Sequence, residues 1–339
     1  MLSVASCNCA GLRGSNLTGK SALRGFSMAE WLKNSPEIDI LAIQETRVNE
    51  IQVRDPLLKM GIDYDDFFFQ PDLYKKGHGG VALVARSGKF TDIKTPFEDI
   101  ESSQKNGFSG RWIEGDWEDQ TGRKLKIVCA YLHHADSPKV KLANGELIDR
   151  DKAIKSMDDK HKFMASVTQR IRQIDKECKK TNKPYLIVGD FNIAHHKIDI
   201  KNWKSNIDKA GFLPEERAWM ELWMPTNKKF IEENEFFSNK EIVYKYNSRL
   251  DYCPPKTNQF SEGSLNMVDV QRTLVGQKPC YTWWSNRGRA FDNDTGWRID
   301  YQMACPELAK KAKKVRVDKA DSYYHRWSDH APLVVDYDL

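Results

Sequence analysis

The stretch Tyr185–His196 reads YLIVGDFNIAHH. It begins with an apolar run of strand length, and from Gly189 onward it carries a carboxylate, an amide and two imidazoles. Polar groups that directly follow a buried strand stand at the edge of a sheet, where they can meet a ligand. Asp190 and Asn192 are two residues apart, so a strand that continues through both places them on one face. A turn explains this pair equally well, because Gly, Asp and Asn are common where strands stop.

Similar apolar runs recur along the chain and predict further strands. Each is rich in Val, Ile, Leu or Tyr and is bounded by turn or polar residues. They read LSVAS, IDILAIQE, GVALVAR, LKIVCAYL, RIDYQMA and APLVVDYD.

Helical patterns are fewer and irregularly placed. Residues 28–34 follow Ser27, a predicted N-cap, and residues 213–224 carry Pro214 in their first turn. Residues 159–180 form an apolar stripe with a charged opposite face. Many strands with few helices indicate an α/β fold in which two sheets form a sandwich flanked by helices, and they argue against a regular βαβ repeat.

The 339 residues contain no repeat and no Ser/Gly-rich linker, so we expect a single domain over residues 1–339. Two polar segments, at about 136–160 and 227–263, are expected to be insertions. No apolar run reaches the ~18 residues that cross a bilayer. The start of the chain does not resemble a signal peptide. We therefore expect a cytoplasmic protein without a membrane partner.

Seven cysteines lie scattered without zinc spacing, which favours reduced thiols. The formal charge of +5 permits a polyanionic partner without requiring one. Cysteine spacing and charge therefore exclude little by themselves.

Several other predicted strands also end or begin in a polar side chain. Alone, each has an ordinary structural explanation: a Glu at a strand end is usually a solvated charge, and a Tyr is usually part of the core. Together they form a pattern that turn chemistry explains poorly. Oxygen ligands such as Glu45, Asn8 and Asp329 suit a hard cation such as Mg²⁺. The polar residues at these ends are Asn8, Glu45, Tyr131, Asp300, Asp329 and His330.

In their order and context these segments resemble the exonuclease III family of AP endonucleases, within the endonuclease/exonuclease/phosphatase superfamily. The resemblance spans nearly the whole chain apart from the two insertions. The segment from Asn192 to Arg217 and GWRIDY are the parts most specific to the DNA-repair branch. The matching segments are SCNCAGLRG, DILAIQETRV, GHGGVALVAR, CAYLHH, GDFNIAHHKIDIKNWKSNIDKAGFLPEER, YTWW with GWRIDY, and SDHAP.

The resemblance implies a DNase I-like four-layer α/β sandwich with two mainly antiparallel sheets. It implies that Glu45 binds the metal directly, with Asn8 and Asp329 near or on the metal. Asp190, aided by Asn192, would orient or deprotonate the attacking water. Tyr131 would contact the scissile phosphate, and His330, oriented by Asp300, would bind a phosphate oxygen. Trp283, Trp297 and Ile299 match the pocket for a base-free sugar, and Arg13, Asn202 and Asn206 match contacts to the DNA backbone.

One position departs from the family pattern. The family usually has Asp or Asn two residues after the first ligand Asn, and here that residue is Ala10. One outer metal contact is therefore missing. Two alternatives stay open: a superfamily phosphatase for a small phosphoester or phospholipid, and a DNA-binding protein that has lost turnover.

The resemblance also implies an activity and its partners. We expect Mg²⁺, with Mn²⁺ as a substitute, and a monomer that acts on double-stranded DNA with abasic sites or blocked 3′ ends. The expected reaction is hydrolysis of the phosphodiester 5′ to an abasic site, with 3′-phosphodiesterase or 3′→5′ exonuclease activity, in base excision repair.

Overall fold

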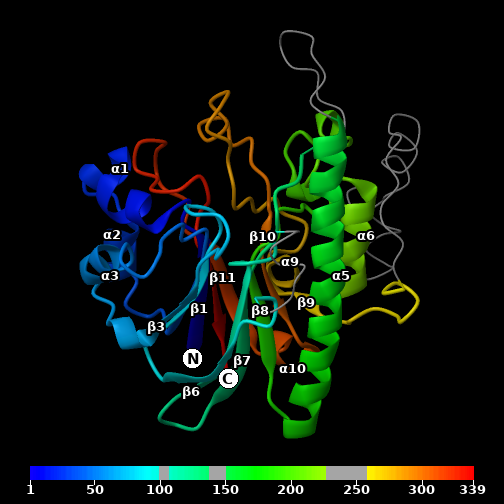
Figure 1. Cartoon of the computed structure of the whole chain (residues 1–339), viewed down its shortest axis with the longest axis horizontal. Coiled ribbons are helices and arrows are strands. Elements are labelled where there is room, and N and C mark those ends of the chain that lie inside the picture. The colour runs from blue at the N-terminus through cyan, green and yellow to red at the C-terminus, as the bar shows by residue number, and fades with distance from the viewer. Residues whose placement is uncertain (99–106, 137–149, 227–257) are drawn as a thin grey trace.

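Two six-stranded β-sheets pack face to face and carry helices on their outer sides (Figure 1). The structure, a computed structural model, describes residues 1–98, 107–136, 150–226 and 258–339. The first sheet has the order β11 (Ala312–Val317), β12 (Leu333–Tyr337), β1 (Leu2–Asn8), β2 (Ile40–Gln44), β4 (Val81–Ala85), β3 (Phe67–Gln70). The second has the order β5 (Lys89–Lys94), β6 (Trp112–Glu118), β7 (Lys124–Tyr131), β8 (Tyr185–Asp190), β10 (Asp300–Ala304), β9 (Val268–Asp269).

Antiparallel pairing dominates both sheets, as predicted. Within the described residues, each sheet contains one parallel pair, β1 with β2 and β7 with β8. These pairs form the middle of their sheets, and all other neighbours are antiparallel. The predicted DNase I-like sandwich is therefore confirmed in both its layers and its strand directions.

Alternate side chains of β1 pack into the two different layers on either side of the first sheet. Leu2 and Val4 belong to the core cluster that the two sheets share, whereas Ala5 and Cys7 pack under the helices of the first sheet. Successive side chains of a strand point to opposite faces, so this pattern requires cover on both sides. Asn8 has the parity of Leu2 and Val4, and it therefore points between the sheets.

Helices close the two outer faces (Figure 1). The predicted N-cap is confirmed, because the Ser27 hydroxyl accepts the Glu30 N–H at 3.1 Å. The long helix α5 begins at Arg150, inside the range expected to be the first insertion, and its apolar stripe is buried as predicted. The rest of that segment, 137–149, and most of the second, 227–257, lie outside the described residues. The α-helices of the described residues are α1 (Lys20–Leu23), α2 (Met28–Lys33), α3 (Arg54–Met60), α5 (Arg150–Thr181), α6 (Pro214–Trp223), α9 (Val270–Val275) and α10 (Pro306–Ala309).

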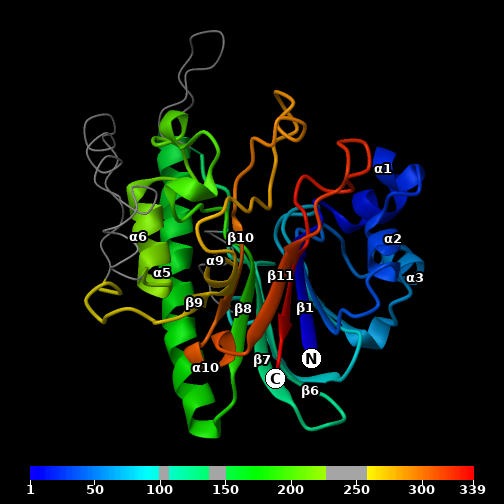
Figure 2. The ribbon, with the colours of Figure 1, turned by 180° about the vertical axis from the view of Figure 1, so that it is seen from behind.

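Strand direction brings the polar ends to one rim. The parallel pairs end at Asn8 and Gln44 in one sheet and at Tyr131 and Asp190 in the other. Because β10 and β12 run antiparallel to their neighbours, the start of each strand lies at this same rim. Figure 2 shows both sheets from the opposite side, with β1 and β11 in the first sheet and β8 in the second.

The structure bears on two of the general expectations. The six cysteines of the described residues are unpaired, and five of them are buried. No helix in the described part of the chain combines the length and the apolar character that a bilayer crossing requires.

Candidate active site

Asp190 stands at the centre of the rim, at the last position of β8. The preceding Gly189 has a φ of +147°, and a Cβ there would lie 1.8 Å from the Ala130 carbonyl oxygen of β7. Only glycine lets the two parallel strands approach this closely. From the other sheet, Asn8 Nδ2 donates to Asp190 Oδ2 at 2.9 Å. The close strand contact and this cross-sheet bond fix the carboxylate between the two sheets.

The strand does not continue to Asn192, as one reading of the sequence assumed. Asn192 has a φ of +50°, and its backbone N–H donates to Asp190 Oδ1 at 2.8 Å. Its side-chain Nδ2 donates to Asp190 Oδ2 at 3.2 Å and to the Leu132 carbonyl at 2.9 Å. The turn therefore brings together the two side chains that strand parity was expected to align.

His330 and Asp300 complete a buried chain of polar contacts. Asp300 opens β10, rather than ending a strand as expected, and it lies directly opposite Asp190 in the antiparallel register. The Asp300 carboxylate is 2.9 Å from His330 Nδ1, and His330 Nε2 is 3.7 Å from Asp190 Oδ2. Asp300 therefore orients His330, and the free edge of the imidazole faces Asp190 and the cavity.

The electrostatics of these groups follow from burial. Burial raises the pKa of Asp190 to about 7, although the His330 charge pulls in the opposite direction. Burial alone would lower the pKa of His330, but Asp300 and Asp190 outweigh it and raise that pKa to about 10. A carboxyl group whose pKa is near neutrality is suited to accept a proton, and a charged imidazole is suited to bind a phosphate oxygen.

Glu45 follows β2 at the same rim with a φ of +54°. Its carboxylate accepts hydrogen bonds from the Tyr131 hydroxyl and from the Arg47 guanidinium. Burial, and after it the Glu45 charge, raises the pKa of Tyr131 well above its ordinary value, so the hydroxyl stays protonated. The Arg111 guanidinium lies 4.9 Å from the centre of the Tyr131 ring. Tyr131 is thus held as a donor beside Glu45.

One cavity of about 800 Å³ joins these groups. The carboxyl groups of Glu45, Asp190 and Asp329 line it together, so the common rim expected from the sequence exists. The Trp283 and Trp297 rings form one wall, 6.0 Å apart and nearly perpendicular, and Trp283 Nε1 donates to Asp329 Oδ2 at 3.0 Å. The predicted residues that line the cavity are Asn8, Glu45, Tyr131, Asp190, Asn192, Trp283, Trp297, Ile299, Asp329 and His330.

Four predicted residues do not line this cavity. Asp300 lies behind His330, and Arg13 and Asn202 are exposed on the surface. Asn206 is partly exposed, and its side chain donates to the Asn202 carbonyl at 2.7 Å. The segment that carries both asparagines nevertheless reaches the cavity at residues 209–211.

The donor set fits a hard cation. Glu45 and Asp329 present carboxylate oxygens to the cavity, which Mg²⁺ prefers. Asn8 is better placed to hold Asp190 than an ion, because its Oδ1 already accepts the Ala10 N–H at 2.9 Å. Within the described residues, the three side chains whose ligand atoms lie within 4.8 Å of one another are Asp190, Asp300 and His330. His330 already pairs with Asp300 at 2.9 Å and lies 3.7 Å from Asp190, so these ligand atoms are engaged with one another.

Sequence reasoning missed two supporting contacts. Lys160, fully buried in α5, donates to the Asn192 carbonyl at 3.0 Å and to Glu216 at 2.6 Å. Arg47 pairs with Glu45. Arg47 lies two residues after Glu45 in a quoted motif and could have been found. Lys160 looks like one more charge on the polar side of a helix, so only the packing reveals it.

Comparison with known proteins identifies the family. A sequence model of the Endonuclease/Exonuclease/phosphatase family matches residues 5–330. The chain belongs to this family. It is 30% identical over 188 residues to an exodeoxyribonuclease of Streptococcus pneumoniae, an alignment that covers 55% of this chain and 51% of that protein. The match thus spans about half the length of that relative.

Two proteins that match over nearly the full length of the chain are also nucleases by name. An exodeoxyribonuclease of Bacillus subtilis is 23% identical over 94% of this chain and 95% of its own length. The 3′–5′ exonuclease structure from Neisseria meningitidis has a TM-score of 0.65 at 20% identity, with full coverage of both chains. The resemblance to the exonuclease III type that the sequence indicated is confirmed.

Proposed function

We propose that this chain is a Mg²⁺-dependent DNA-repair nuclease that hydrolyses the phosphodiester 5′ to abasic sites. The proposal includes 3′-phosphodiesterase and 3′→5′ exonuclease activity, and the relatives from Streptococcus pneumoniae and Bacillus subtilis are named exodeoxyribonucleases. The observation that carries it is the placement of Asp190: a buried carboxylate, fixed by Asn8 and Asn192, opens on the same cavity as Glu45 and His330.

Asp190 is the group that takes a proton from the attacking water. Its pKa is raised to about 7 by burial, so it can accept a proton near neutral pH. The Asn192 and Asn8 amides donate to its oxygens, which holds the carboxylate in one orientation during the transfer. Such fixed geometry supplies part of the rate enhancement, because the reacting groups lose little freedom at the transition state.

His330, Tyr131 and a bound cation act on the phosphate. The charged His330, oriented by Asp300, and the protonated Tyr131 hydroxyl are donors for the oxygens on which negative charge builds. Glu45 and Asp329 would hold Mg²⁺, or Mn²⁺ in its place, with Asn8 beside them. The cation, when bound, neutralises phosphate charge as a Lewis acid.

The wall formed by Trp283 and Trp297 supports an abasic site as the substrate. Trp283, Trp297 and Ile299 offer a narrow apolar surface next to the catalytic groups, in a cavity that a bare deoxyribose can enter. A sugar without a base has little stacking to lose when it leaves the helix. Arg13, Asn202 and Asn206, on the surrounding surface, are proposed to contact the DNA backbone.

The test is incision of an abasic duplex by purified protein in Mg²⁺ and again in EDTA. Undamaged nicked DNA and inositol phosphates serve as comparison substrates. We expect incision of the abasic duplex that EDTA abolishes, and a loss of about 10²–10³-fold in both Asp190→Asn and His330→Ala with the fold retained. Cleavage of inositol phosphates in preference to DNA, or wild-type turnover by either variant, contradicts the proposal.

A further inference from the structure

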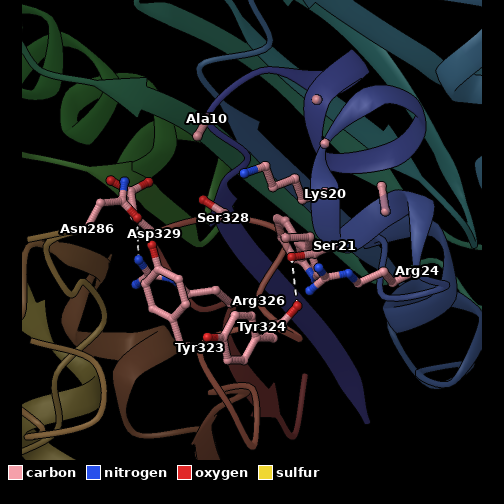
Figure 3. Close-up of a pocket in the computed structure, with 14 residues that line it drawn as sticks. Ala10, Lys20, Ser21, Arg24, Asn286, Tyr323, Tyr324, Arg326, Ser328 and Asp329 are labelled. Atoms are coloured by element: carbon pink, nitrogen blue, oxygen red, sulfur yellow. Dashed lines mark hydrogen bonds between the residues drawn. The ribbon is translucent and has the colours of Figure 1, made fainter. Parts of the chain in front are cut away.

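A second cavity, of about 530 Å³, lies beside the active site, between the N-terminal segment and the loop that precedes β12 (Figure 3). Ala10, Asn286 and Asp329 line both cavities, so the two adjoin. We call the second cavity the tyrosine groove, after Tyr323 and Tyr324 on its wall. The proposed function assigns no role to it.

The tyrosine groove is cationic. Lys20 and Arg24 come from the N-terminal segment, and Arg326 comes from the loop on the other side. Within the described residues, Lys20 and Arg24 have no carboxylate partner. Asp329, at the end shared with the active site, is the one acidic side chain among the residues that line the groove. Three cations facing one space with so little compensation attract an anionic ligand.

The wall of the groove also presents aromatic faces. Tyr324 is 65% exposed and Tyr323 is 37% exposed, with their rings 5.8 Å apart and nearly perpendicular. The Arg326 guanidinium lies 4.3 Å from the Tyr323 ring centre, and that of Arg24 lies 5.7 Å from the Tyr324 ring centre. Exposed aromatic rings among cations are the combination with which proteins bind single-stranded nucleic acid.

The two sides of the groove are tied together. Ser21 Oγ donates to the Tyr324 carbonyl at 2.9 Å, across 303 positions of sequence. The Phe26 and His325 rings stack at 3.6 Å. Arg326 Nη1 donates to the Trp284 carbonyl at 3.0 Å. These contacts form the groove before any ligand arrives, which lowers the entropy that binding costs.

We propose that the tyrosine groove binds an unpaired nucleotide of the DNA strand that passes through the active site. The inference rests on the proposed function in one respect, that DNA lies in the adjoining cavity. A base within a duplex is stacked on its neighbours and cannot offer its face to a tyrosine, whereas an unpaired base can. Its phosphate meets Lys20, Arg24 and Arg326, and the cavity volume is within the roughly 300–1,000 Å³ of small-ligand sites.

The experiment measures binding in EDTA, so that no strand is cut. Fluorescence anisotropy gives the Kd of the full chain for a labelled oligothymidylate and for a blunt duplex. Tyr324→Ala is expected to raise the Kd for oligothymidylate about tenfold, and the Kd for the duplex by a clearly smaller factor. Tyr324→Phe keeps the ring and should retain wild-type binding.

The outcomes separate the two proposals. A selective loss in Tyr324→Ala, rescued in Tyr324→Phe, supports the groove. An unchanged Kd, or an equal loss on both DNAs, overturns it. Failure of the wild-type protein to incise abasic duplex in Mg²⁺ refutes the proposed function instead. That result comes from the incision assay and not from the binding measurement.

Discussion

The buried ion pair between Lys160 and Glu216 yields the sharpest quantitative prediction. Both side chains are fully buried, with 2.6 Å between Lys160 Nζ and Glu216 Oε1. The same ammonium group donates to the Asn192 carbonyl, and Glu216 Oε2 accepts the N–H groups of Gly211 and Leu213. One ion pair therefore joins α5, α6 and the turn that carries a proposed catalytic amide.

The perturbation is Lys160→Met, which keeps the length of the side chain and removes its charge. It leaves the Glu216 carboxylate buried with two backbone donors and no cation. Breaking a buried pair by removal of one partner costs about 3–5 kcal/mol. The Asn192 turn also loses its anchor, so we expect the incision rate of the abasic duplex to fall about 10–100-fold.

The assay is equilibrium urea unfolding followed by tryptophan fluorescence. The matched control is Lys155→Met in the same helix, where Lys155 is 62% exposed and pairs with Asp159 at 2.5 Å. An exposed pair of this kind contributes about 0.3–0.5 kcal/mol. In the double variant, Glu216→Gln should restore at least about 1 kcal/mol of the loss caused by Lys160→Met, because the unpaired charge is gone.

Two results refute this reasoning. One is a free energy of unfolding for Lys160→Met that matches Lys155→Met. The other is simple additivity of Lys160→Met and Glu216→Gln, because groups in direct contact should be coupled.

The remaining predictions concern the sugar wall, the strand contact and pH. Trp297→Ala should reduce discrimination for abasic over undamaged DNA more than it weakens binding to undamaged DNA, measured by competition binding; equal losses contradict the assigned wall. Gly189→Ala should lower the free energy of unfolding by about 3–5 kcal/mol, because its Cβ meets the Ala130 carbonyl at 1.8 Å. Gly122→Ala, with a φ of +82° and no atom within 4 Å, should cost only about 1 kcal/mol in the same urea titration. Burial lowers the pKa of His161 to about 4 from 6.5. As pH falls below 6.5, His161 is protonated in the unfolded chain before it is protonated in the folded protein. The stability that neutral His161 contributes above pH 6.5 is therefore lost as pH falls toward 4. At ~1.4 kcal/mol per pKa unit, His161→Gln should reduce the loss of stability between pH 7 and pH 5 by about 2 kcal/mol, and equal slopes would contradict this.

Local patterns in the sequence determined the layers of the fold. The apolar runs became strands, the stripe from Phe163 to Ile174 became the buried face of α5, and Ser27 capped its helix. These features depend on neighbours within a few residues, so period and capping chemistry are enough to predict them. The same patterns indicated a two-sheet sandwich. The resemblance supplied its DNase I-like arrangement, because strand runs alone do not specify which strands pair.

Tertiary structure decided what the polar residues contact. Asn8 and Asp190 lie 182 positions apart and meet because the ends of β1 and β8 share one rim. The turn at Asn192, the anchoring of that turn by Lys160 and the assembly of the tyrosine groove all depend on contacts between distant segments. No local pattern encodes such contacts, because they arise only when packing of the apolar faces has fixed the separation and direction of the strands.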